Sequence, residues 1–356
     1  LTDTNTGVDH DIDANSGVGN MVIHTDINSE GSDPKLLIKV AGTTVLTAKD
    51  TGDIDVSGVD IGRGGSGVSS NTALGTQTLE DNSTGGNNVA VGYQALSNNS
   101  TGSGNSATGY RALYSNSTGF GNVATGYHAL RANTVGGSNV ANGYEALYFN
   151  STGVNNSATG YRALYSNTTG DDNVANGFQT LVNNTTGDGN VANGYQALLS
   201  NTTAYFNSAT GYQALYNNTT GANNLANGYR ALFSNTTGFN NVGIGTHALY
   251  SNTTGSGNFG AAFRNSSGTY LPVFNPTTHS NRVVMGHTAV TNAYVQVAWT
   301  VVSDERDKTE IEPMNEGLDF VEQLNPVSYK FRKDRDTEET NGKKRYGFLA
   351  QDVLAI

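Results

Sequence analysis

The chain has 356 residues, enough for two or three domains, and its composition is not that of an ordinary enzyme. It contains 45 glycines, 5 prolines and no cysteine, and 14% of its residues are charged. The lack of cysteine excludes disulfide bridges and cysteine-ligated zinc, and no apolar run reaches the about 18 residues that a membrane-spanning helix needs. A net charge of −11 disfavours nucleic acid and anionic lipid as partners. The chain starts at Leu1 with no basic-then-apolar leader, so we expect a fragment or a trimmed product.

Residues 1–70 are predicted to form a β-rich connector or attachment segment. Residues 21–24, 35–40 and 44–48 are rich in apolar and β-branched side chains. Stretches of Asn, Ser, Gly and Asp separate them, which is typical of strands joined by turns.

One stretch of this segment has the spacing of a calcium loop. Asp11, Asp13 and Asn15 match the first three ligands of such a loop. However, Gly17 falls one place late, and Val22 stands where the final glutamate is required. We therefore interpret the stretch as a solvated turn and predict no resident metal.

From Asn71 to Asn258 a 17-residue unit recurs without insertion or deletion, reading Asn-(Val/Ser)-Ala-x-Gly-Tyr-x-Ala-Leu-x-x-Asn-(Thr/Ser)-Thr-Gly-x-x. A short period without slippage indicates that each unit stacks on its neighbours. With one coil per unit and strands about 4.8 Å apart, eleven coils predict a rod roughly 50 Å long. The leucine of the unit appears eleven times, at Leu79, Leu96, Leu113, Leu130, Leu147, Leu164, Leu181, Leu198, Leu215, Leu232 and Leu249.

Each unit contains one candidate strand, Asn-(Val/Ser)-Ala-x-Gly, whose side chains alternate between two faces. Asn122, Ala124 and Gly126 would point one way. Val123 and Thr125 would point the other way. The Asn/Ala/Gly face is nearly identical in every unit, so we expect it to be packed, with its asparagines in a hydrogen-bonded ladder. A second short strand or a bend would carry Gly-Tyr-x-Ala-Leu, and Asn-Thr-Thr-Gly would form a turn through residues that tolerate left-handed geometry.

A helical repeat is the alternative, because Tyr-x-Ala-Leu-x-x could form a turn or two of helix. Two glycines and several Asn or β-branched residues in every unit argue against it, as do the longer periods of helical repeats. We therefore predict a mainly β protein built around a β-solenoid or β-roll. Each coil supplies only one Leu, two Ala and a Tyr to a core, and this small core favours side-by-side packing of several chains, hence a homotrimer.

Three sets of repeat residues are candidates for chemistry. Asp171 and Asp188 lie one coil apart, so their carboxylates would be about 5 Å from each other, the separation found in retaining glycosidases. However, both stand just after the turn glycine, at a position that varies between units, and this favours solvated turn residues. His128 and His247 share a position seven coils apart, too far to share a metal within one chain. A column of aromatic residues could stack on sugars, but packing of the rings on one another is favoured. It comprises Tyr93, Tyr110, Tyr127, Tyr144, Tyr161, Phe178, Tyr195, Tyr212 and Tyr229.

Charge is unevenly placed along the chain. Residues 71–262 contain four Arg, no Lys and six acids, whereas residues 304–356 contain nine bases and thirteen acids. This step in composition indicates a domain boundary. Before it lies a predicted β connector, residues 265–303, with strand-like stretches at 282–285 and 294–299.

The repeat resembles those of phage and marine-virus tail-fibre proteins in its Asn-x-Ala-x-Gly-Tyr-x-Ala-Leu and Asn-Thr-Thr-Gly segments. It is more loosely similar to the head repeats of trimeric autotransporter adhesins, which form left-handed β-rolls in a trimer. The resemblance covers about half of the chain and implies a trimeric shaft, here residues 71–264.

The C-terminal part contains four short motifs in a fixed order. Ser303-Asp-x-Arg-x-Lys is followed by Gly317-Leu-x-Phe, Pro326-Val-x-Tyr and Tyr346-Gly-Phe-x-Ala-Gln. This series is very similar to the intramolecular chaperone domain of endosialidase-type tail spikes and tail fibres. The resemblance implies a small α+β module, residues 304–356, that helps three chains to trimerise and fold. The family's domain continues through further long helices, so this stretch is expected to be its N-terminal part.

The resemblance also implies self-cleavage at the bond between Ser303 and Asp304, with Ser303 as nucleophile and Lys308 as its base. A serine hydroxyl is a poor nucleophile until a neighbouring group accepts its proton, and a neutral lysine can do so. The shaft itself is expected to have no enzymatic activity, and no motif in the chain calls for a cofactor.

Three functional hypotheses follow. The leading one is a homotrimeric structural subunit of a viral or phage tail fibre, located in the virion. Its partners would be its own copies, tail or baseplate proteins and a host surface glycan or protein, with no nucleic acid and no membrane insertion. The second is a bacterial trimeric adhesin or an extracellular filament subunit at the cell surface. The third is a glycan-degrading tail spike.

Overall fold

The computed structural model describes residues 21–26, 35–40, 43–48, 53–261, 276–286, 327–332 and 340–347. The chain divides into two compact units, Leu1–Asn292 and Ala293–Ile356. All regular elements of the described residues are strands, which confirms the prediction of a mainly β protein. Within the same residues, no helix is long and apolar enough to cross a membrane.

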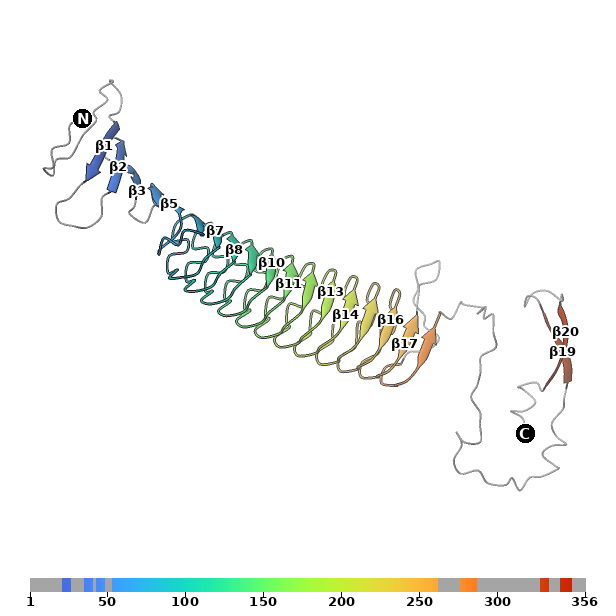
Figure 1. The fold of residues 1–356 in the computed structure, drawn as a ribbon. Coiled ribbons are helices and arrows are strands. Elements are labelled where there is room, and N and C mark those ends of the chain that lie inside the picture. Colours follow the sequence, from blue (N-terminus) through green and yellow to red (C-terminus); the bar gives the residue numbers. More distant parts are fainter. Residues whose placement is uncertain are drawn as a thin grey trace. The chain divides into compact units, whose positions relative to one another are not determined.

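The shaft is a β-solenoid with one short strand in each 17-residue coil (Figure 1). Each strand pairs in parallel with the strand one coil away and without a register shift, so that Ala124 lies opposite Ala107 and Ala141. The predicted solenoid is thus confirmed. Its strands are β6 Thr72–Leu74, β7 Val89–Val91, β8 Ser106–Thr108, β9 Val123–Thr125, β10 Val140–Asn142, β11 Ser157–Thr159, β12 Val174–Asn176, β13 Val191–Asn193, β14 Ser208–Thr210, β15 Leu225–Asn227, β16 Val242–Ile244 and β17 Phe259–Ala261.

A further rung follows the regular repeat. β18, Val283–Met285, pairs in parallel with β17 after a longer interval, with Val283 opposite Phe259. The strand-like stretch predicted at 282–285 is therefore the last described strand of the same sheet.

The core of each coil is small and lies on the predicted face of the strand. In the coil of β9, Ala124, Ala129 and Leu130 are fully buried, whereas Val123 and Thr125 are exposed. The leading asparagine, Asn122, is also fully buried. Its Oδ1 accepts a hydrogen bond from the Asn139 backbone N–H at 2.9 Å, and this pattern repeats along the shaft as the predicted asparagine ladder.

The segment Gly-Tyr-x-Ala-Leu forms the bend, rather than the second strand, of the two alternatives. Its residues hydrogen-bond to adjacent coils, as when the Leu130 N–H donates to the Ala146 carbonyl. However, His128 and Leu130 have φ of 57° and 51°, in the left-handed region, which a strand does not allow. At Gly126, with φ 131°, an added Cβ would collide with the Gly143 carbonyl, so both geometry and space require glycine.

The turn Asn-Thr-Thr-Gly is present, but for a different reason from the one predicted. Asn133 and its counterparts are not left-handed; they are fully buried and form a second ladder. Asn133 Nδ2 donates to Asn116 Oδ1 at 2.8 Å and to the Gly136 carbonyl at 2.9 Å. The turn glycine is needed for close approach, because a Cβ on Gly119 would collide with the Gly136 carbonyl of the next coil.

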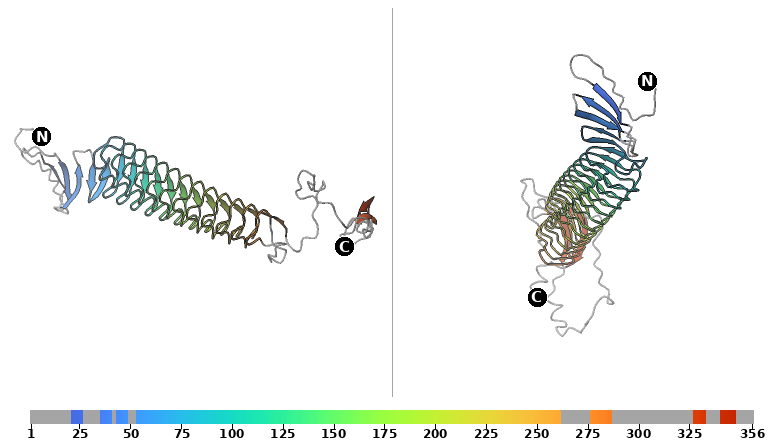
Figure 2. Two further views of the ribbon diagram at one scale, coloured as in Figure 1. Left: turned by 90° about the horizontal axis from the view of Figure 1, so that it is seen from below. Right: turned by 90° about the vertical axis from the view of Figure 1, so that its left-hand side faces the viewer.

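An antiparallel meander precedes the first coil (Figure 2). Its strands are β1 Met21–Asp26, β2 Lys35–Val40, β3 Thr43–Ala48, β4 Ile54–Val56 and β5 Val59–Gly62. The last of them pairs antiparallel with β6, with Ile61 opposite Leu74. The meander thus supplies a hydrogen-bonded neighbour to the first strand of the parallel sheet, and the strands predicted in residues 1–70 are present.

The second unit contains a two-stranded antiparallel sheet in its described residues. β19, Val327–Arg332, pairs with β20, Thr340–Gly347, and Val327 lies opposite Gly347. The helical part of the α+β module expected here lies outside the described residues.

Candidate functional site

One side of the shaft carries a column of stacked aromatic rings, the tyrosine column defined by the repeat. Consecutive rings lie 5.0–5.4 Å apart between centroids, and their planes differ by 4–13°. A sugar that stacks on an aromatic side chain needs an open ring face, and here neighbouring rings occupy those faces. The packing interpretation is confirmed, and the partly exposed rings present mainly their edges to solvent.

The residue that follows the tyrosine position of the repeat, which is Thr or Phe in three coils, forms a second line, which we call the polar column. Its side chains link adjacent coils: Arg111 Nε donates to Gln94 Oε1 at 2.6 Å, and Arg162 Nε donates to Glu145 Oε2 at 2.7 Å. These bonds fix the two guanidinium groups on the shaft surface. The members are Gln77, Gln94, Arg111, His128, Glu145, Arg162, Gln179, Gln196, Gln213, Arg230 and His247.

The residue that follows the buried leucine is aromatic in six coils and forms a second, interrupted aromatic column, with Tyr114, Tyr148, Tyr165, Tyr216, Phe233 and Tyr250. Where these rings are consecutive they also stack, as Tyr148 and Tyr165 do at 5.3 Å between centroids. In one coil the position is taken by Arg131, whose Cζ lies 5.6 Å from the Tyr114 ring centroid and 5.5 Å from that of Tyr148. Its Nη1 donates to the Tyr148 hydroxyl at 2.9 Å. The Arg131 guanidinium therefore takes the place of an aromatic ring between Tyr114 and Tyr148.

Arg111 and Arg131 meet beside Tyr114, and the charges of both act on His128; we call the three residues the Arg–His cluster. The Arg111 Cζ lies 5.3 Å from the Tyr114 ring centroid, and the His128 ring packs on Tyr127 at 4.0 Å. Burial and then the charge of Arg131 lower the pKa of His128; Glu145 opposes the shift and Arg111 adds to it. His128 Nε2 and Arg131 Nε are buried without a hydrogen-bond partner in the described part of the chain.

Sequence reasoning singled out His128 but missed its arginine neighbours. It tested the histidine only as a metal ligand, and His247, seven coils away, cannot complete such a site in the same chain. Arranging the arginines by position in the 17-residue unit would have placed Arg111 beside His128, and Arg131 between two aromatic positions. That signal was present in the sequence.

Asp171 and Asp188 occupy equivalent positions in adjacent coils, as predicted, and backbone groups use their carboxylates. Asp188 Oδ1 accepts from the Asp171 N–H at 2.8 Å, and Asp171 Oδ1 accepts from the Val154 N–H at 2.7 Å. Ser256 makes the same kind of bond to the Phe239 N–H, so the position serves to bridge coils. This role argues against a glycan-cleaving acid pair.

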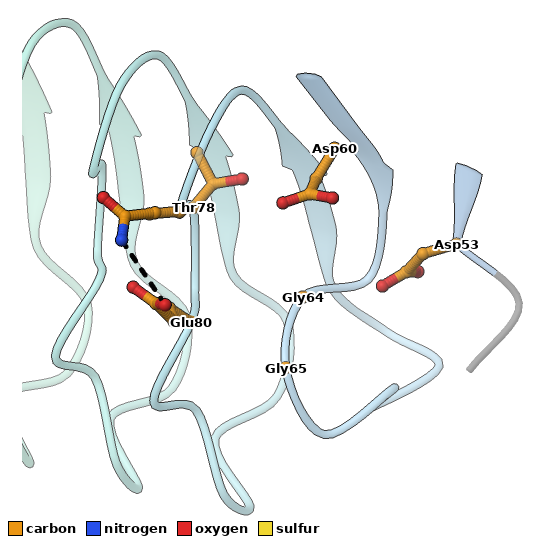
Figure 3. A pocket seen from close by; sticks show the side chains of 7 residues that line it. Asp53, Asp60, Gly64, Gly65, Thr78 and Glu80 are labelled. Carbon is orange, nitrogen blue, oxygen red and sulfur yellow. Dashed lines mark hydrogen bonds between the residues drawn. The ribbon is translucent and has the colours of Figure 1, made fainter. Parts of the chain in front are cut away.

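A hollow of about 240 Å³ at the start of the shaft is lined by Asp53, Asp60 and Glu80 (Figure 3). Asp53 is almost fully buried, and its Oδ1 accepts a hydrogen bond from the Arg63 N–H at 2.6 Å. No group of three or more His, Cys, Asp or Glu among the described residues is arranged to hold a metal ion. Through its bond to the Arg63 N–H, the Asp53 carboxylate holds the backbone that follows β5.

The predicted self-cleavage residues Ser303, Asp304 and Lys308 lie outside the described residues. So do Asp11, Asp13 and Asn15. Two of the four C-terminal motifs do meet: in the β19–β20 pair, Tyr329 of Pro-Val-x-Tyr lies opposite Arg345, and Ser328 lies opposite Tyr346 of Tyr-Gly-Phe.

The C-terminal segment also matches a known family. Residues 303–356 fit the family described as the chaperone of endosialidase. The match begins at Ser303 and includes all four motifs, so the resemblance seen in the sequence is confirmed for this segment. No curated protein and no solved structure matches the chain.

Proposed function

We propose that the protein is a structural, receptor-binding subunit of a viral or phage tail fibre, in which three copies associate. The observation that carries the proposal is the succession, in one chain, of a uniform β-solenoid and a segment that matches the chaperone of endosialidase. A stack of identical coils holds its ends at a fixed separation, which is the mechanical task of a fibre. Parallel sheets fold slowly and expose unpaired edges meanwhile, so a folding aid suits such a shaft.

The parts of the chain then have distinct tasks. Residues 1–70 attach to tail or baseplate proteins, and residues 71–264 form the shaft that faces a host glycan or protein receptor. Residues 265–303 connect the shaft to the chaperone segment, residues 304–356, which is removed by cleavage after Ser303.

The outer face of the sheet supports association of copies. Val123, Val140 and Val174 are each about two-fifths exposed and stand in one uncharged column with Val, Ser and Leu residues of other coils. Parallel sheets are usually covered on both faces. The small core of a single coil adds a second reason, because covering the outer valines would bury further apolar surface.

Sedimentation velocity of the purified chain tests the association. The expected species has three times the chain mass of 37.2 kDa. A folded monomer at micromolar concentration would contradict the proposal. Electron microscopy with a shaft-specific antibody tests the location: labelled tails of intact particles are expected, and a labelled bacterial surface would favour an adhesin instead.

A further inference from the structure

We propose that the Arg–His cluster binds the anionic group of an acidic polysaccharide, a carboxylate or a sulfate ester. As a receptor contact, this site depends on the proposed fibre function. Binding itself does not, because affinity is measurable on the purified chain whatever its oligomeric state.

The first argument is the placement of charge. Residues 71–261 contain four arginines and no lysine, in a chain of net charge −11. Three of the four, Arg111, Arg131 and Arg162, fall within four successive coils, and Arg162 is neutralised by Glu145 at 2.7 Å. The partners of the other two are neutral, Gln94 for Arg111 and Tyr148 for Arg131. A local excess of positive charge therefore remains at Arg111 and Arg131.

The second argument is preorganisation. Both guanidinium groups lie within 5.6 Å of the Tyr114 ring centroid, and Arg131 is also held by Tyr148. A guanidinium presents a planar set of N–H donors that matches a carboxylate or sulfate oxygen pair. Because the rings already restrict these side chains, binding an anion loses less conformational entropy than it would with free arginines.

The third argument is the pair of unsatisfied atoms. Arg131 Nε and His128 Nε2 are buried and have no hydrogen-bond partner in the described part of the chain. A buried donor without an acceptor is unfavourable, commonly by about 1–3 kcal/mol. Because Arg131 Nε is closed off from solvent, a ligand oxygen would reach it only after the side chain shifts, and the cost of the unsatisfied donor favours that shift.

The surroundings favour a sugar over other polyanions. The polar column continues through the neutral Gln94 and Gln77 on one side; on the other side come Glu145 and Arg162, which pair with each other, and then the neutral Gln179. Amide and hydroxyl groups hydrogen-bond to sugar hydroxyls, whereas the negative net charge of the chain opposes densely charged nucleic acid or anionic membranes. One anionic group among neutral hydroxyls fits this arrangement.

Isothermal titration calorimetry with three soluble probes tests the proposal: a polyuronate, dextran sulfate and uncharged dextran. Binding of either charged probe without binding of dextran is expected. The probe that binds more tightly distinguishes a carboxylate from a sulfate ester as the preferred group. Equal binding of uncharged dextran, or no binding of either charged probe, would overturn the proposal.

The variants come from the shaft itself. Arg111→Gln introduces the residue found in neighbouring coils of the polar column, and Arg131→Tyr continues the second aromatic column, so both suit the fold. Each should weaken binding of the charged probe by about tenfold or more, as expected for loss of a charged hydrogen-bonding partner. Arg230→Gln is the matched control, because Arg230 has the same column position and a Gln213 partner but no second arginine nearby.

The control should change affinity less than about twofold. An equal loss in Arg230→Gln would show attraction by general charge only and would overturn the proposal. Sedimentation of the same samples reports association separately, so a failed fibre proposal and a failed anion site give different results.

Discussion

At the scale of single residues, the shaft depends on buried asparagines whose side-chain amide groups are hydrogen-bonded to adjacent coils. In the ladder formed by the first asparagine of each unit, Asn122 Oδ1 accepts a hydrogen bond from the Asn139 N–H, and Asn122 Nδ2 donates to the Gly136 carbonyl at 2.8 Å. In the second ladder, formed by the asparagine of each Asn-Thr-Thr-Gly turn and here called the turn ladder, Asn167 Nδ2 donates to both Asn150 Oδ1 and the Gly170 carbonyl. A buried amide is stable only with such partners, so the repeat keeps asparagine at both positions.

The hydrogen bonds of the turn ladder predict that exchanging one amide nitrogen for an oxygen greatly lowers the stability of the fold. Asn167→Asp replaces two N–H donors with an oxygen that faces the Asn150 and Gly170 oxygens. An uncompensated buried charge typically destabilises a fold by about 3–5 kcal/mol, so the midpoint of urea unfolding should fall sharply. Asn142→Asp, at an exposed strand position, is the control and should change stability by about 0.5 kcal/mol or less. Equal effects of the two substitutions would contradict a role for the ladder.

His128 predicts a pH dependence of stability. Its pKa lies below the ordinary value of 6.5, owing first to burial and then to Arg131, with Arg111 adding and Glu145 opposing. Between the lowered pKa and 6.5 the unfolded chain binds more protons than the folded chain, so stability should fall as pH decreases through this window and stay level above it. His128→Gln should flatten this slope in thermal melts from pH 7 to pH 5. An unchanged slope would show that another group is responsible.

At the scale of the coil, the strand and its faces could be predicted, but the path between strands could not. Alternation alone assigned Ala124 to the core and Val123 to the surface, as observed. The bend contains Leu130 in the left-handed region, a geometry that costs a bulky residue about 1–2 kcal/mol and that no propensity rule predicts. Asn133 likewise suited either a left-handed turn or a buried ladder. The packing of adjacent coils determines the backbone conformation at both Leu130 and Asn133.

The coil is also the unit that can be removed. Deleting residues 156–172 removes one complete coil and brings β10 next to β12, so that Ala141 lies opposite Ala175. The asparagines of both ladders can then hydrogen-bond across the new junction. Because each coil contacts mainly its neighbours, the shortened shaft should remain folded, with a melting temperature within about 5 °C of the parent.

The matched control deletes residues 156–163, a partial coil that shifts every later asparagine out of its column. The coils on either side keep their own registry, but the sheet and both asparagine ladders are interrupted at the junction, so this chain should melt well below the full-coil deletion in circular dichroism. Equal melting temperatures for the two deletions would contradict strict registry as the basis of the fold.

At the scale of the whole molecule, the sequence predicted the shaft and the chaperone segment more completely than the Arg–His cluster. The repeat predicted the solenoid because every coil repeats the same buried positions, and the four C-terminal motifs predicted the chaperone segment that residues 303–356 match. The repeat places Arg111 beside His128, but Arg131 occupies a different position of the 17-residue unit, so the contact of both arginines with one ring appears only in the folded coils. Their shared ring, Tyr114, is a contact of the folded chain.

The proposed self-cleavage predicts a defined change in the assembled chain. If the Ser303 hydroxyl gives its proton to Lys308 and attacks the carbonyl carbon of the bond to Asp304 once trimers form, an ester replaces the peptide bond and the Asp304 amine leaves with a proton; water then hydrolyses the ester to a carboxylate at Ser303. Mass spectrometry should then detect a fragment ending at Ser303 and a second fragment beginning at Asp304. Ser303→Ala removes the hydroxyl nucleophile and Lys308→Gln removes the base, so both variants should stay intact while still forming trimers. An uncut parent chain in assembled trimers would exclude self-cleavage, and cleavage of the Ser303→Ala variant would assign the cut to another nucleophile.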